Sequence, residues 1–88
     1  MIGLLGFGTV GQGVWEILKK NQFPYVVKKI LVRNLNKERP GVEDKKIFTD
    51  KPEEILEDKE IHIILECTGD DRAYNWIKKA FESGKDVV

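Results

Sequence analysis

The chain has one cysteine, one histidine and no net charge, and each of these features excludes a class of protein. Cys67 cannot form an internal disulfide, which is typical of proteins in a reducing compartment, so we predict a cytoplasmic location. His62 has no second ligand at a useful spacing, so we predict no metal site. Fifteen basic residues balance fifteen acidic ones, which argues against a nucleic-acid or anionic-membrane binder.

Long apolar runs are absent as well. No run approaches the roughly 18 residues of a membrane span, and no signal peptide precedes the first strand, so we predict no membrane association. The 88 residues predict one small domain. Charge is uneven within it: residues 1–49 carry nine basic and four acidic residues, whereas residues 50–88 carry six and eleven. The positive half suits an anionic ligand.

The most informative motif occupies residues 6–11, between an apolar run and an amphipathic segment. It has the form G-x-G-x-x-G in a strand–turn–helix context, which predicts a dinucleotide-binding site. Gly6 would permit the tight turn, Gly8 would let the backbone approach a diphosphate, and Gly11 would let the helix pack closely on the sheet. The diphosphate would meet the free N–H groups at the helix N-terminus.

Strand and helix patterns alternate along the rest of the chain. This predicts an α/β fold, a Rossmann-type parallel sheet with helices on both faces and strand order 3-2-1-4. A complete domain of this type has six strands, so we expect residues 1–88 to be an incomplete NAD(P)-binding Rossmann domain, truncated in its second half. The predicted elements are a helix over 10–21, a strand over 25–32, a loop over 34–46, a strand over 47–49, a helix over 52–58, a strand over 61–65, a helix ended by Gly84, and the start of a strand at 86–88.

Two details of the predicted helices can be tested against a structure. Thr49 or Asp50 is expected to cap the second helix, and Asp70 or Asp71 the third. The third helix is also expected to bury one apolar face. That face consists of Ala73, Ile77, Ala80 and Phe81, with Tyr74 beside it.

The end of the second strand bears on the choice of cofactor. An NAD-preferring domain usually has Asp or Glu there, whereas this chain has Arg33, 22 residues after Gly11. A guanidinium can pair with the 2′-phosphate of NADP and stack on adenine. Asn34 could still bind an unmodified ribose, and Lys37 or Arg39 could add to a phosphate pocket. NADP is therefore the favoured cofactor, with NAD as the alternative.

Four segments together resemble the N-terminal cofactor-binding region of homoserine dehydrogenase. They are residues 2–14, 32–34, 66–69 and 80–88. The resemblance implies an oxidoreductase that interconverts L-homoserine and aspartate 4-semialdehyde, on the branch leading to threonine and methionine. It also implies that the whole protein forms a homo-oligomer.

The resemblance assigns further cofactor contacts. Phe7, Thr9 and Val10 would contact the cofactor through their backbone, and Thr68 and Gly69 would line its ribose and nicotinamide side. Cys67 lies near the same site, where we interpret it as a small apolar side chain. The family often has glycine where this chain has Asp70, which leaves the shape of that loop open.

The resemblance places the catalytic residues in a substrate domain that follows this region in the family. We therefore expect no catalytic residue among residues 1–88 and no activity from the chain alone. Two alternatives remain open: a nucleotide-sensing module without catalysis, and the N-terminal domain of another NAD(P)-dependent dehydrogenase. The sequence Gln-Gly-Val at residues 12–14 favours homoserine dehydrogenase over the second alternative.

Overall fold

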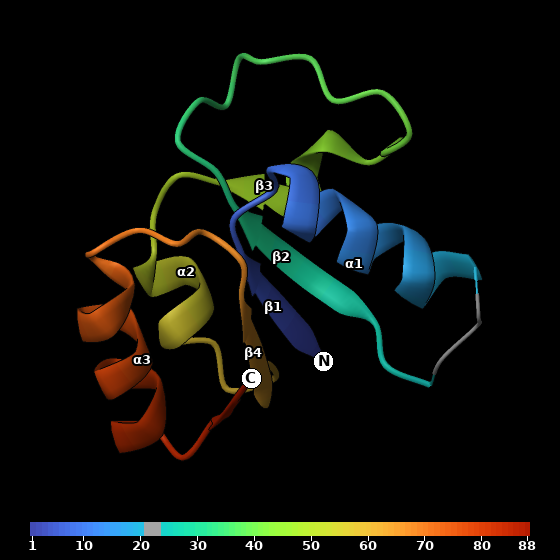
Figure 1. The fold of residues 1–88 in the computed structure, drawn as a ribbon. Coiled ribbons are helices and arrows are strands. Elements are labelled where there is room, and N and C mark those ends of the chain that lie inside the picture. Colours follow the sequence, from blue (N-terminus) through green and yellow to red (C-terminus); the bar gives the residue numbers. More distant parts are fainter. Residues whose placement is uncertain (21–23) are drawn as a thin grey trace.

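A computed structural model describes residues 1–20 and 24–88. Five parallel strands form a single sheet in the order β3-β2-β1-β4-β5 (Figure 1). The strands are β1 (Ile2–Leu5), β2 (Val27–Leu31), β3 (Phe48–Thr49), β4 (Ile63–Glu66) and β5 (Asp86–Val87). The predicted α/β class and the order 3-2-1-4 are confirmed, with β5 added outside β4.

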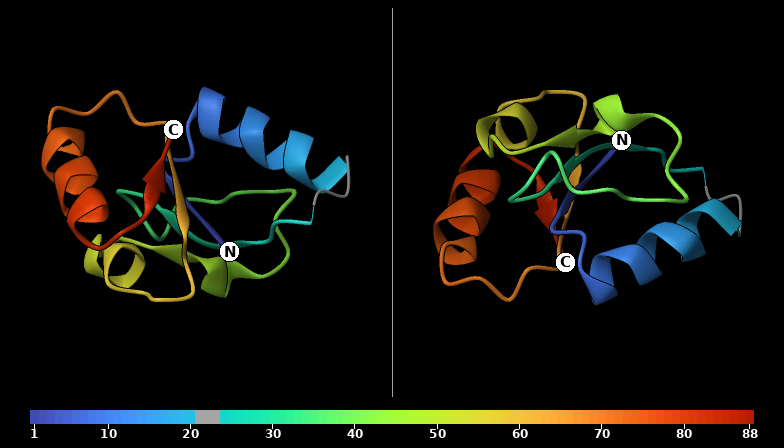
Figure 2. Two further views of the ribbon diagram at one scale, coloured as in Figure 1. Left: turned by 90° about the horizontal axis from the view of Figure 1, so that it is seen from below. Right: turned by 90° about the horizontal axis from the view of Figure 1, so that it is seen from above.

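The helices lie on both faces of the sheet, as predicted. The helix α1 (Thr9–Lys20) covers one face, and α2 (Glu53–Leu56) and α3 (Ala73–Glu82) cover the other (Figure 2). A single turn of 3₁₀ helix, η1 (Lys45–Ile47), precedes β3. Among the described residues, no helix has the length and apolarity needed to cross a membrane.

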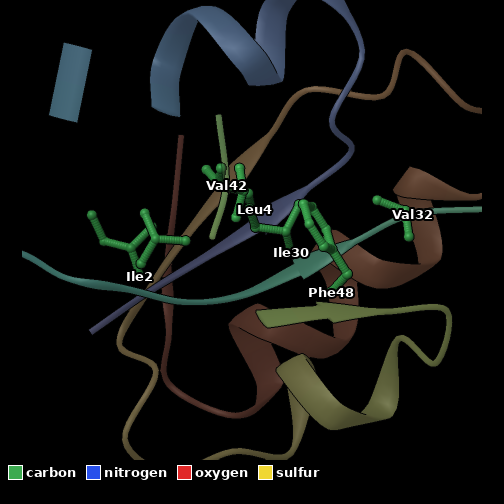
Figure 3. Packing of buried hydrophobic residues seen from close by; sticks show 7 residues of the cluster. Ile2, Leu4, Ile30, Val32, Val42 and Phe48 are labelled. Carbon is green, nitrogen blue, oxygen red and sulfur yellow. The ribbon is translucent and has the colours of Figure 1, made fainter. Parts of the chain in front are cut away.

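The core has two parts because successive strand residues point to opposite faces. Ile2, Leu4 and Ile30 belong to the buried cluster that Figure 3 shows. Val14, Trp15 and Leu18 of α1 pack against this cluster. Leu5, Leu31 and Ile64 point the other way, towards α2 and α3. Strands buried on both faces explain the nearly continuous apolar sequence of β1 and β4.

Some predicted boundaries were wrong for local reasons. Ile61 is fully buried but lies before β4, because its N–H donates to the carbonyl of Asp58 in a turn. Ile47 ends η1 rather than beginning β3, because Asp44 accepts a hydrogen bond from the N–H of Lys46 and starts that helical turn. The predicted last residue of the first helix, Asn21, falls outside the described residues.

The predicted caps were partly right. Neither α2 nor α3 has a side-chain cap at its N-cap residue, and Asp50 does not cap α2. Instead, Thr49 Oγ1 accepts from the N–H of Lys51, and Asp70 Oδ1 accepts from the N–H of Arg72, in the turns that lead into these helices.

The C-terminal end of α3 is as predicted. Gly84 has a φ of +80° directly after the C-cap residue Ser83. The N–H of Lys85 donates to the carbonyl of Ala80, and that of Gly84 to Phe81. This is the Schellman arrangement that glycine favours at a helix end.

The predicted apolar face of α3 was only partly right, because Ile77 is partly exposed and belongs to neither core cluster. Ala73 and Ala80 are buried, but Phe81 is 61% exposed. Trp76 packs against the core instead. Residues 73, 76 and 80 share the face of α3 towards the sheet, and the two alanines let the helix approach closely enough for the indole to pack beside them.

Candidate functional site

The candidate site lies where three parallel strands end together. The N–H of Gly6 donates to the carbonyl of Leu31 over 3.0 Å, and the N–H of Cys67 donates to the carbonyl of Leu5 over 2.8 Å. The segments after β1, β2 and β4 therefore meet at one edge of the sheet (Figure 1). The carboxyl edge is where open α/β sheets bind ligands.

Two glycines of the motif are required by the fold itself. Gly6 has a φ of +104°, and a Cβ added there would lie 2.7 Å from the Cγ2 of Thr68. A Cβ on Gly11 would overlap the carbonyl oxygen of Gly6, so α1 could not pack this closely on the turn. The steric roles that the sequence analysis gave to these two positions agree with the structure.

Gly8 differs from both, because a Cβ added there would meet nothing within 4 Å. Packing within the chain therefore does not explain a glycine at this position. The carbonyl of Gly8 accepts from the N–H of Gln12, and the side-chain amide of Gln12 donates to the carbonyl of Phe7 over 3.2 Å. These bonds fix the start of α1, whose first N–H groups have no partner within the helix.

A cleft of about 1000 Å³ opens beside this turn. It brings together seven of the predicted site residues, namely Gly6, Phe7, Gly8, Arg33, Asn34, Cys67 and Thr68. Lys37 and Arg39, which were predicted to add positive charge, also line it. Thr9, Val10, Gly11 and Gly69 do not line the cleft. Thr9 and Val10 are exposed in the first turn of α1, Gly11 is buried behind it, and Gly69 is exposed after β4.

The side chain of Phe7 is partly buried and packs against the core beside the cleft. Its ring makes edge-on contacts with the rings of Phe48, at 5.3 Å, and Trp15, at 6.4 Å between centroids. These contacts anchor the glycine turn to α1 and β3. A ring held in this way is consistent with the backbone contact that the resemblance implies for Phe7.

The loop after β4 is shaped by hydrogen bonds between alternate residues. The Glu66 carboxylate accepts from the N–H of Thr68 over 2.7 Å and also from its hydroxyl. The Thr68 hydroxyl oxygen in turn accepts from the N–H of Asp70 over 2.9 Å. This network directs Glu66 into the loop and brings Asp70 to the cleft.

Asp70 joins two guanidinium groups at the cleft. Its Oδ2 lies 2.8 Å from Nη2 of Arg33 and 2.8 Å from Nη2 of Arg72. The side chain of Asp70 is 9% exposed, compared with 81% for Arg33. Hydrogen bonds from Arg72, chiefly from its side chain, and then from Arg33 hold the pKa of the Asp70 carboxyl well below its ordinary value.

The thiol of Cys67 lines the cleft without being activated. Its burial raises the pKa, and the charge of Glu66 raises it further. Its Sγ lies 3.8 Å from the carbonyl oxygen of Leu65. A thiol whose pKa is raised stays protonated at neutral pH, so the structure supports the interpretation of Cys67 as a small apolar side chain.

Besides Asp70, six residues that line the cleft were missed as site residues. They are Leu31, Val32, Asp50, Pro52, Arg72 and Trp76. Asp70 was considered as a helix cap and as a departure from the family pattern, and the sequence held no signal that it would pair with a residue 37 positions away. The guanidinium of Arg72 lies over the ring of Trp76 at 5.4 Å, a pairing that their spacing on one helical turn could have suggested.

The sheet, the glycine turn and the cleft define a Rossmann-type dinucleotide-binding domain. A sequence model of the family described as homoserine dehydrogenase, NAD binding domain, matches residues 6–88. The chain therefore belongs to the family of homoserine dehydrogenase NAD-binding domains.

Individual proteins agree with this assignment. The homoserine dehydrogenase of Bacillus subtilis is 31% identical over 99% of this chain, and that of Methylobacillus glycogenes is 35% identical over 99%. A crystal structure of S. aureus homoserine dehydrogenase superimposes with a TM-score of 0.88 and 36% identity, covering 98% of this chain. The chain spans 22% of the Bacillus protein, 23% of the Methylobacillus protein and 24% of the S. aureus chain.

Proposed function

We propose that this chain is the cofactor-binding part of a homoserine dehydrogenase that interconverts L-homoserine and aspartate 4-semialdehyde. The pathway would be the branch leading to threonine and methionine, and the location the cytoplasm. One observation carries the cofactor site: Gly6 and Gly11 are demanded by the packing of the chain, whereas Gly8 faces open space beside the cleft. A glycine with no steric role inside the protein is explained by a ligand that approaches its backbone.

The residues of the cleft fit a nicotinamide dinucleotide. Its lining carries four cationic side chains, Arg33, Lys37, Arg39 and Arg72, against the two carboxylates of Asp50 and Asp70. The N-terminus of α1 adds N–H groups and the positive end of a helix dipole next to Gly8. We assign the diphosphate to residues 6–11 and the ribose and nicotinamide side to residues 67–69.

The bound nicotinamide would supply the hydride acceptor or donor. The residues of the cleft bind and orient the cofactor. The glycine turn lets the diphosphate approach the backbone closely, and the neutral thiol of Cys67 adds no competing nucleophile. Hydride transfer also needs a substrate held in near-attack geometry, a contribution that can reach about 7–11 kcal/mol. We assign that task to a substrate domain elsewhere in the whole protein, and expect the whole protein to be a homo-oligomer.

We favour NADP over NAD because of Arg33. Its guanidinium lies at the end of β2, lines the cleft and is 81% exposed, so a 2′-phosphate could reach it. Lys37 and Arg39 line the same cleft. Each of these cations makes few contacts within the chain: Arg33 has one ion pair, and Arg39 donates to the carbonyl of Lys37 and lies over the ring of Phe48.

Substitution of Gly8 tests the cofactor site. We expect Gly8→Val to weaken the binding of both NADP and NAD by more than about a hundredfold, because the isopropyl group would occupy the space that the diphosphate needs. Calorimetric titration measures both dissociation constants, and circular dichroism checks that the variant is folded. The matched control is Gly13→Val, since a Cβ at Gly13 also meets nothing within 4 Å but Gly13 lies outside the cleft.

The control should keep the affinity of the parent chain. Unchanged affinity in a folded Gly8→Val variant would show that residues 6–11 form only a turn. Equal losses in both variants would show that α1, rather than the approach to Gly8, controls binding.

A further inference from the structure

The pair formed by Arg33 and Asp70 connects the two sides of the cleft. Arg33 follows β2 and Asp70 belongs to the loop after β4, and these strands flank β1 on opposite sides. Both residues line the same cleft as Gly6 and Gly8. The ion pair of 2.8 Å therefore joins the segment assigned to the adenosine ribose to the segment assigned to the nicotinamide side.

The two members of the pair are held very differently. Asp70 accepts hydrogen bonds from the N–H, Nε and Nη2 of Arg72, and its side chain is 9% exposed. Arg33 is 81% exposed, and its hydrogen bond to Asp70 is the only one that its side chain makes among the described residues. Arg33 is therefore the mobile partner, and Asp70 keeps Arg72 when Arg33 leaves.

We propose that Asp70 moderates the preference for NADP by competing with the 2′-phosphate of NADP for Arg33. The proposal rests on the proposed function, in which Arg33 is the residue that binds this phosphate. To bind NADP, Arg33 must exchange the carboxylate of Asp70 for the phosphate. Binding of NAD requires no such exchange, because its ribose carries a hydroxyl group at that position. Asp70 thereby reduces a preference for NADP that Arg33 alone would make stronger.

The size of this effect follows from the exposure of Arg33, the solvent-facing partner of the pair. An exposed ion pair contributes little in water and is screened by salt. We therefore expect Asp70 to weaken NADP binding by about two- to fivefold at low ionic strength. The Asp70 carboxylate would also repel the phosphate dianion directly, and the neighbouring guanidinium of Arg72 limits that repulsion.

The test uses Asp70→Asn, because an amide oxygen can still accept from the N–H of Arg72 and so keep the turn before α3. We expect this variant to bind NADP about two- to fivefold more tightly than the parent chain at low salt, with an unchanged NAD dissociation constant. The matched control is Asp71→Asn, which removes an exposed carboxylate that makes no ion pair among the described residues. The control should change neither constant.

A double-mutant cycle with Arg33→Ala identifies the cause. In the Arg33→Ala background, most of the effect of Asp70→Asn on NADP should be lost if the two groups compete for one guanidinium, leaving only the small part due to direct repulsion. An equal gain in the Arg33→Ala background, or an equal gain for NADP and NAD, would overturn the proposal. If Arg33→Ala weakens the binding of NADP selectively and Asp70→Asn changes neither dissociation constant, Asp70 does not compete with the phosphate but the proposed role of Arg33 stands. If Arg33→Ala has no selective effect, the proposed role of Arg33 and the competition by Asp70 are both wrong.

Discussion

The glycine turn and the Arg33–Asp70 pair lie at the same edge of the sheet, but they are held by different kinds of force. The turn is fixed by close packing: a side chain at Gly6 would meet Thr68 and the backbone of Cys67, and one at Gly11 would meet the backbone of Gly6. The pair is an exposed contact between side chains that lie 37 residues apart. The turn is therefore rigid and depends little on solution conditions, whereas the pair responds to salt and pH.

This difference corresponds to two tasks. A backbone turn can bind the diphosphate that NAD and NADP share, and it cannot distinguish the two cofactors. An exchangeable ion pair can respond to the single phosphate by which they differ. Affinity for the common part and discrimination between the cofactors are thus expected to change independently on mutation.

The largest effect is expected where packing is tightest. Gly11→Val should destabilise the fold by about 3 kcal/mol or more, because the backbone of Gly6 cannot move aside as a flexible side chain can. In a domain of this size that lowers Tm by roughly 12–24 °C, measured by circular dichroism. Gly13→Ala in the same helix meets open space and should raise stability by about 0.5–1 kcal/mol. Similar Tm values for both variants would show that the close approach of Gly11 to Gly6 is not essential.

Removing or reversing the charge at Arg33 should have the next largest effect, and it should weaken the binding of NADP but not of NAD. Arg33→Ala is expected to weaken NADP binding by about ten- to a hundredfold, the range for a lost charge-assisted contact. Arg33→Asp should weaken it further by repulsion, and should favour NAD by offering an acceptor to its ribose hydroxyls. Titrations with both cofactors at low and physiological salt measure the change. Equal losses for both cofactors would assign Arg33 to adenine or to the local backbone instead.

The smallest effect concerns acid stability. Because the pKa of Asp70 is lower in the folded protein than in the unfolded chain, its ionised form stabilises the fold. That contribution is fully present above the unfolded pKa of about 4 and is lost as the pH falls through the lower folded value. The difference in Tm between the parent chain and Asp70→Asn should therefore shrink below about pH 4. A difference that stays constant with pH would show that Asp70 acts through hydrogen-bond geometry rather than charge.

The sequence was sufficient to predict the sheet and the glycine turn because both depend on local patterns. Apolar runs predict buried parallel strands, and the spacing of three glycines predicts a turn into a helix. The same reasoning identified Arg33 from its place at the end of β2. The family and the fold were also recognised correctly from these segments.

Contacts between distant segments could not be predicted in this way. The expected polar loop over 34–46 contributes Val42, which is 3% exposed and packs in the core on the α1 side. Phe81 fits the helical period of α3 but lies in solvent, because Trp76 packs against the core in its place. The pairing of Asp70 with Arg33 depends on how far two separate loops extend over the sheet edge. The hydrophobic periodicity of the sequence does not predict how loops extend.

The central place of β1 in the sheet has a consequence for how the chain is made. Its residues pair with β2 on one side and, on the other, with β4, whose residues follow about sixty positions later. At synthesis rates of about 5–20 residues per second, β4 is synthesised roughly 3–12 seconds after the apolar strand Ile2–Leu5. During that interval a ribosome-bound chain exposes one edge of a strand that is buried in the finished domain, which makes it a natural substrate for chaperones that bind nascent apolar segments.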